Sequence, residues 1–155
     1  MAEDRSEARQ ALEKLVINFT EAFNREDLDE VMSYFADDGI YDEFNGMRHQ
    51  GKVAIRAAFE PLLSGDFGRA CFHTEDMFID LGEAPGTGKA MIRWLLTLEE
   101  DARAGGWRGL DLLHFEGGKL KEKHTYAKTR LPRIDKKAES QRVRQAIDEG
   151  VLAPL

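Results

Sequence analysis

Hydrophobic residues recur at intervals of three and four positions near the start of the chain. Within residues 6–24 they are Ala8, Ala11, Leu12, Leu15, Val16, Phe19 and Phe23. This spacing places their side chains along one side of a helix, because an α-helix turns once every 3.6 residues. It predicts a long amphipathic helix with a single buried stripe.

Two more helices and a hairpin are indicated before residue 65. Asp27 is a suitable N-cap with Glu30 at the capping-box position, so a short helix through Phe35 should end at Gly39. Residues 40–44 then read as a strand, and Asn45-Gly46 is a turn signal leading into residues 47–50. A third helix should follow Gly51 and end or bend near Pro61. Its predicted buried residues are Val53, Ile55, Ala58, Phe59 and Leu62.

The hydrophobic pattern changes in the second half of the chain. Four segments rich in aromatic, β-branched and leucine residues alternate with glycine-containing loops, which predicts an antiparallel meander. The segments are 69–81, 89–100, 107–116 and 119–129. Strands that follow a group of helices indicate an α+β fold. We predict one domain over 1–129 and a C-terminal extension over 130–155, with a helix ending at Gly150.

Composition narrows the choice of partners. The 155 residues include 22 basic and 29 acidic side chains, a net charge of −7, which argues against a nucleic-acid or anionic-membrane surface. A small molecule is the expected partner. Cys71 is the single cysteine, no apolar leader is present, and no run reaches the roughly 20 apolar residues of a membrane span. These features favour a cytoplasmic protein.

Several catalytic and binding motifs are missing. Gly86-Thr87-Gly88-Lys89 does not make a phosphate loop, because Glu83 and Ala90 stand where glycine and Ser or Thr are needed. The four histidines lack the spacing of a metal motif, which leaves only a site assembled from separate strands. We expect no metal and no cofactor.

Two stretches resemble the nuclear transport factor 2-like superfamily, in the branch of the ketosteroid isomerases and SnoaL-like polyketide cyclases. They are FTEAFNREDLDEVMSYFADDGIYDEFNGMRHQGKVAIRAAFEPLL and RGLDLLHFEGGKLKEKHTYAKT, and the similarity extends over residues 8–129. The resemblance implies a cystatin-like cone, in which a strongly curved antiparallel sheet wraps around the first helix and encloses an apolar pocket. It also implies a homodimer formed through the convex sheet face.

The resemblance also implies site residues. In the steroid isomerases one carboxylate shuttles a proton, while a tyrosine and a neutral aspartic acid hydrogen-bond the developing enolate. Aligning Ala36-Asp37-Asp38 places the shuttling carboxylate at Glu43, and aligning Phe115 with the Gly-Gly-Lys turn places the neutral acid at Asp111. The tyrosine position falls on Phe19, which cannot donate a hydrogen bond. Loss of one such donor typically costs about 10²–10³ in rate.

Strand alternation leaves two choices of face open. Tyr41 and Glu43 share one face of the first strand and Asp42 the other, so only one of the two acids can enter the pocket. The resemblance favours Glu43 as the acid in the pocket, whereas the apolar neighbours Ile40 and Phe44 favour Asp42. On the last strand, the more hydrophilic appearance of the Lys121, Lys123 and Thr125 face favours His124 and Tyr126 as pocket residues. The family register favours the opposite face.

The remaining candidates follow from their neighbours along the strands. Asp111 shares a face with Leu113 and Phe115, an apolar setting that favours a neutral, hydrogen-bond-donating acid. An ion pair with Arg93 or Arg108 is the alternative. His73 is a further candidate for proton transfer, and Arg93 could act as a pocket cation. Phe19, Tyr41 and Phe59 are candidate lining residues, whereas Trp94 and Trp107 are expected in the core or an interface.

The leading hypothesis is cofactor-free proton transfer of the isomerase, cyclase or hydratase kind on an apolar or lightly oxygenated small molecule. Its groups would be Glu43 or Asp42 as base and Asp111 as donor, assisted by His73, His124 or Tyr126. The alternative is a non-catalytic ligand-binding or assembly domain of the same fold.

Overall fold

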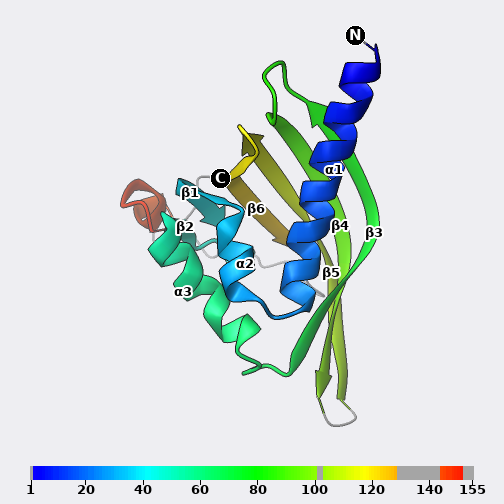
Figure 1. Cartoon of the computed structure of the whole chain (residues 1–155). Coiled ribbons are helices and arrows are strands. Elements are labelled where there is room, and N and C mark those ends of the chain that lie inside the picture. Colours follow the sequence, from blue (N-terminus) through cyan, green and yellow to red (C-terminus); the bar gives the residue numbers. More distant parts are fainter. Residues whose placement is uncertain (1, 101–102, 129–143, 152–155) are drawn as a thin grey trace.

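The computed structural model describes residues 2–100, 103–128 and 144–151 (Figure 1). The helices before residue 100 are α1 (Ala2–Asn24), α2 (Leu28–Ser33) and α3 (Lys52–Leu63). The strands are β1 (Phe35–Asp42), β2 (Arg48–Gln50), β3 (Arg69–Leu81), β4 (Gly88–Glu100), β5 (Arg103–Glu116) and β6 (Lys119–Ala127). The predicted α+β class and the four-stranded meander are confirmed, with small shifts at the strand ends.

One curved sheet contains all six strands in the order β2-β1-β6-β5-β4-β3. Neighbouring strands are antiparallel except β1 and β6, which run parallel. In Figure 1 the sheet bends around α1, with α2 and α3 beside the β1–β2 end. The sheet therefore has a concave face covered by helices and a convex outer face.

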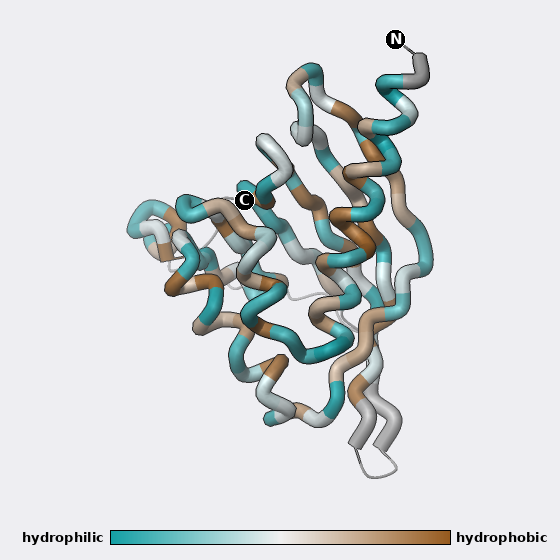
Figure 2. Tube along the Cα trace, in the orientation of Figure 1, coloured by the Kyte–Doolittle hydropathy of each residue, from teal (hydrophilic) through white to brown (hydrophobic). Residues whose placement is uncertain are grey.

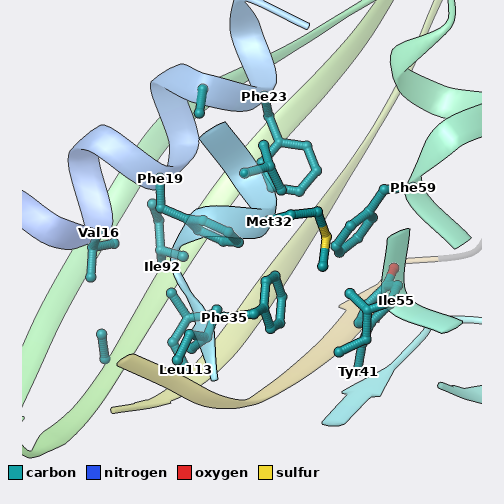
Figure 3. Packing of buried hydrophobic residues seen from close by; sticks show 14 of the residues in the cluster. Val16, Phe19, Phe23, Met32, Phe35, Tyr41, Ile55, Phe59, Ile92 and Leu113 are labelled. Carbon is teal, nitrogen blue, oxygen red and sulfur yellow. The ribbon is translucent and has the colours of Figure 1, made fainter. Parts of the chain in front are cut away.

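Aromatic side chains from helices and strands fill the space between α1 and the concave face. Phe19 packs edge-on against Phe23 and Phe35, with ring centroids 5.1 and 5.8 Å apart. Phe23 in turn meets Phe59 of α3 at 5.0 Å. Figure 3 shows these rings converging from α1, β1 and α3, and Figure 2 shows hydrophobic positions interspersed with hydrophilic ones along α1. The predicted buried stripe of the first helix supplies one wall of this core.

The second helix is shorter than its sequence pattern predicted. Asp27 caps it as expected, since its carboxylate accepts a hydrogen bond from the Glu30 backbone N–H at 2.9 Å. However, the helix ends at Ser33, and Phe35 begins β1, where it pairs with Leu120 of β6. Burial and strand pairing of Phe35 override its helical spacing. Gly39 lies within β1 rather than at a helix end, and a Cβ there would meet the Ala36 carbonyl at 3.1 Å.

The predicted hairpin and third helix are present. Gly46 adopts a φ of 89°, which suits glycine in this turn. The helix α3 runs through Pro61 and ends at Leu63, so the proline lies in its last turn. Val53 is 88% exposed, which contradicts its predicted burial. The predicted Ile55 and Phe59 are buried, and they are joined by Leu63, which was not predicted.

The described part of the C-terminal extension contains a short helix over residues 144–148. Its end has two characteristic bonds, from the Gly150 N–H to the Ile147 carbonyl and from the Val151 N–H to the Ala146 carbonyl. The Val151 carbonyl also accepts a bond from the Arg48 N–H, at 3.3 Å, beside β2. The rest of the predicted extension lies outside the described residues. Among the helices of the described ranges, none is long and apolar enough to cross a membrane.

Candidate functional site

A cavity of about 420 Å³ lies between α1, α3 and the concave face of the sheet. Its wall is largely aromatic and aliphatic. The contributing side chains include Phe19 and Phe23 from α1, Phe59 and Leu62 from α3, and Phe72 and Trp107 from the sheet. A space of this size and lining suits a compact apolar ligand.

The buried carboxylate of Asp111 forms the centre of a polar cluster in this wall. Asp111 is 7% exposed. One of its oxygens accepts bonds from the Lys123 ammonium at 2.7 Å and the Thr125 hydroxyl at 2.6 Å. The other accepts from the Trp94 indole N–H at 3.2 Å. Three donors, one of them a cation, stabilise an ionised carboxylate. In this arrangement Asp111 accepts hydrogen bonds from three neighbours, whereas its apolar strand neighbours had predicted a hydrogen-bond-donating acid.

The cation that pairs with Asp111 is not one of the two predicted arginines. Arg108 binds Glu75 at 2.9 Å, and Arg93 is exposed outside the cavity wall. Lys123 is only 5% exposed, which contradicts the expectation that its face of β6 points to solvent. Its Nζ also donates to the Thr125 hydroxyl at 2.5 Å and lies 4.9 Å from the centre of the Tyr41 ring.

Strand pairing explains why these residues meet. Asp111 is opposite Thr125, and Lys123 is opposite Leu113, the next inward position of β5. Trp94 of β4 is opposite Gly109. The indole occupies the space above this glycine, because a Cβ on Gly109 would lie 2.3 Å from the Trp94 ring. Glycine at position 109 is thus required to seat the indole that binds Asp111.

Tyr41 also lines the cavity, with the Lys123 ammonium 4.9 Å from the centre of its ring. Burial raises the pKa of the Tyr41 phenol far above its usual value, and the negative charges of Glu43 and Asp111 add to this effect. The phenol therefore stays protonated at neutral pH and can donate a hydrogen bond.

Glu43, and not Asp42, lines the cavity. One Glu43 carboxylate oxygen lies 2.9 Å from His49 Nε2 of β2, and both side chains are partly exposed. His49 was not among the sequence-derived candidates. It is the β2 partner of Tyr41, so only the hairpin pairing places it beside Glu43. A carboxylate and an imidazole in contact can accept a proton and pass it on.

Asp42, His124 and Tyr126 lie away from the cavity. Asp42 binds Arg48 through both carboxylate oxygens, at 2.7 and 2.8 Å, and its second oxygen also lies 2.9 Å from His124 Nδ1. Tyr126 is 58% exposed. The predictions that these residues enter the pocket are wrong, because alternate residues of a strand point to opposite faces. The register implied by the family resemblance is the one observed for β6.

His73 and Arg93 are also outside the cavity wall. His73 is exposed and its Nε2 lies 3.0 Å from the Thr97 hydroxyl, while its neighbour Phe72 points inward. Trp94 and Trp107, expected in the core or an interface, both line the cavity. The predicted candidates that the structure does bring to the cavity are Phe19, Tyr41, Glu43, Phe59 and Asp111.

Comparison with known proteins supports this architecture. The SnoaL-like domain family matches residues 16–123, and no curated protein sequence matches the chain. A proposed scytalone dehydratase from Novosphingobium aromaticivorans shares 14% identity, with a TM-score of 0.69 over 83% of this chain and 89% of that one. A proposed polyketide cyclase from Xanthomonas campestris pv. campestris shares 22% identity, with a TM-score of 0.57 over 77% and 91%.

A third similar structure is an NTF2-like protein of unknown function from Mesorhizobium loti. It shares 20% identity, with a TM-score of 0.63 over 78% of this chain and 93% of that one. Other matching structures are described as having a cystatin-like fold. At these identities the similarity demonstrates the predicted fold.

Replacing Lys123 with Met tests the buried ion pair. The variant leaves Asp111 buried without its cation, so we expect the free energy of unfolding in urea to fall by about 3–5 kcal/mol. The double variant D111N/K123M should recover most of this loss, because a neutral amide needs no buried cation. Lys121→Met on the same strand, which removes a solvated pairing with Asp38, should change stability little. Equal losses in the single and double variants would contradict the role of the pair.

Replacing Asp42 with Asn tests the hydrogen-bonded network of Asp42, Arg48 and His124 on the outer face of the sheet. The measurement is the pH dependence of the free energy of unfolding. Burial favours the neutral form of Asp42, but the bonds and charges of Arg48 and His124 outweigh it and lower the pKa of Asp42 below its usual value. Its stabilisation is therefore full above the unfolded-state value of about 3.9 and is lost as the pH falls through the folded-state value. Urea unfolding should show D42N less stable by about 1–3 kcal/mol at pH 7, with the difference shrinking below pH ~4.

The matched control for this experiment is Asp29→Asn, which removes an exposed carboxylate paired with Arg56. It should change stability little at either pH. A D42N difference that stays constant from neutral to acidic pH would contradict the ionised state assigned to Asp42.

Proposed function

Because this chain belongs to the SnoaL-like domain family, we propose that its cavity binds an apolar, lightly oxygenated ring compound and catalyses cofactor-free proton transfer on it. The observation that carries the proposal is the polar cluster of Asp111, Lys123, Thr125 and Tyr41 at one end of an otherwise apolar cavity that Glu43 also lines. Isomerisation, cyclisation and loss of water share a first step of this kind, removal of a proton next to a carbonyl group.

The polar cluster supports binding of a substrate oxygen. A lysine ammonium has three N–H donors, and Lys123 uses two of them on Asp111 and Thr125. The third has no side-chain acceptor within the described part of the chain. Together with the protonated Tyr41 phenol, it can stabilise negative charge that develops on the oxygen. Asp111 then acts as a positioning residue that holds the ammonium, rather than as the donor.

Glu43 is the proposed proton acceptor. It lines the same cavity, and its contact with the partly exposed His49 offers a route for the proton toward solvent. Acid–base groups of this kind typically contribute about 10²–10⁴-fold to rate. The similar structures described as a proposed cyclase and a proposed dehydratase support this class of reaction.

Phe19 favours a second candidate function, non-catalytic binding of the same class of ligand. It occupies the wall beside Phe23 and Tyr34 and brings only carbon to the position where the resemblance places a hydroxyl donor. Under this alternative Lys123 and Tyr41 orient the ligand oxygen, and no proton moves.

We also propose that the protein works in the cytoplasm as a homodimer through the convex sheet face. Exposed Leu112 and Tyr126 on that face support an interface there. The single cysteine supports a reducing compartment.

Filling the cavity tests ligand binding. The probe is 2-naphthol, a flat apolar molecule with one hydroxyl group, and its fluorescence reports binding. Ala58 lines the cavity, so Ala58→Trp should weaken binding at least about tenfold, or about 1.4 kcal/mol. The control Ala57→Trp adds the same side chain to the exposed side of α3 and should bind like wild type. Absence of binding to wild type, or equal affinities in both variants, would overturn the proposed binding site.

Proton transfer is tested with 2-tetralone, an apolar bicyclic ketone with acidic hydrogens next to its carbonyl. Wild-type protein in D₂O should accelerate their exchange for deuterium, followed by NMR. Glu43→Gln should lose about 10²–10⁴-fold of that acceleration because it removes the proton acceptor, while 2-naphthol affinity stays close to wild type. The exposed control Glu60→Gln should behave like wild type. Binding of 2-naphthol without any acceleration of exchange would leave only the non-catalytic alternative.

A further inference from the structure

The convex face of the sheet carries a cluster of metal-ligating side chains outside the cavity. His114 comes from β5, and Glu122 and His124 come from β6. Each offers one nitrogen or oxygen atom, and the three atoms lie within 4.8 Å of one another. Their side chains are 31%, 40% and 21% exposed, respectively, so the cluster is accessible from solvent in a single chain.

Strand pairing brings the three residues together. His114 is opposite Glu122 in the β5–β6 ladder, and His124 is two residues further along β6 on the same face. The Glu122 carboxylate lies between the two rings, 2.8 Å from His124 Nε2 and 3.4 Å from His114 Nδ1. Their separation in sequence hides this arrangement from any motif search.

A second layer of contacts orients the His124 ring. Its Nδ1 lies 2.9 Å from the Asp42 carboxylate, and Arg48 holds that carboxylate through two bonds. With Nδ1 bound to Asp42, the opposite ring nitrogen, Nε2, points at Glu122. Metal-ligating histidines typically show this pattern, in which a carboxylate accepts a bond from the nitrogen that does not bind the metal.

We propose that His114 Nδ1, His124 Nε2 and the Glu122 carboxylate bind one divalent transition-metal ion of the zinc type per chain. Two imidazoles and one carboxylate suit this ion in kind and number, and a fourth position remains for water. Ligands around tetrahedral zinc stand about 3.4 Å apart, so the three side chains need only small rotations to reach that geometry.

The charges around the cluster are compatible with a cation. Glu122 and Asp42 contribute negative charge, and the Arg48 guanidinium is already paired with Asp42. Lys89, opposite His114 on β4, is exposed, and its long side chain can turn toward solvent. The ion would replace the present 2.8 Å contact between His124 Nε2 and the Glu122 carboxylate.

The test uses the full, untagged chain, freed of metal with a chelator and titrated with zinc against a fluorescent chelator. Wild type should bind one zinc per chain with a rise in Tm. His114→Ala and His124→Ala should each weaken binding at least about 100-fold, and D42N, which keeps all three ligands but removes the carboxylate behind His124, about 10–100-fold. The control His73→Ala removes an exposed histidine of β3 and should bind like wild type.

Further measurements keep the outcome interpretable. Circular dichroism confirms that each variant is folded, and Glu122→Gln provides an independent ligand variant. Cobalt in place of zinc should give the intense visible absorption of a tetrahedral site. Light scattering reports whether the ion lies within one chain or bridges two, since the proposed dimer uses the same face.

No saturable zinc binding, one zinc per two chains, or unchanged affinity in both histidine variants would overturn the proposal. Binding of 2-naphthol should be unaffected by zinc, so the two sites can fail separately.

Discussion

The buried ion pair between Asp111 and Lys123 organises the concave side of this protein. Burying two charges is costly unless they are paired at close range and their remaining donors and acceptors are satisfied. Here the Lys123 ammonium lies 2.7 Å from Asp111, and Thr125 and Trp94 complete the shell of the carboxylate. The pair links β5 to β6 and seats the Trp94 indole over Gly109. It also leaves one polar end in an otherwise apolar cavity.

Strand alternation separates two polar networks that are neighbours in sequence. Tyr41 and Glu43 face the cavity, and Asp42 between them faces outward; Lys123 faces the cavity, and His124 faces outward. A shift of one residue in the pairing of β1 with β6 would turn Asp42 toward the cavity and Tyr41 and Glu43 away from it, and so would separate the members of both networks. The inner network suits a ligand oxygen and a proton acceptor. The outer one suits a cation, because its histidines and carboxylates converge at the surface.

A carboxylate–imidazole contact occurs in both networks, and its surroundings determine what each can do. The Glu43–His49 pair stands beside an apolar cavity, where a bound ketone would meet the carboxylate. The Asp42–His124 pair is held from behind by Arg48 and directs the other ring nitrogen at Glu122. The same two side-chain types therefore take part in the proposed proton transfer on one face and in the proposed metal site on the other.

The sequence by itself determined the element order, the meander and the family, because hydrophobic period, caps and glycine turns act over short distances along the chain. Through the resemblance to the steroid isomerases it also predicted Glu43 and Asp111 as pocket carboxyl groups, and both line the cavity. It did not reveal the partner of Asp111, since a lysine reads as a surface residue until a carboxylate is placed beside it. Nor did it reveal His49 next to Glu43 or Phe35 in a strand. Only the tertiary structure decided these, because pairing between distant strands selects which side chains face each other and which charged groups are buried in contact with a partner.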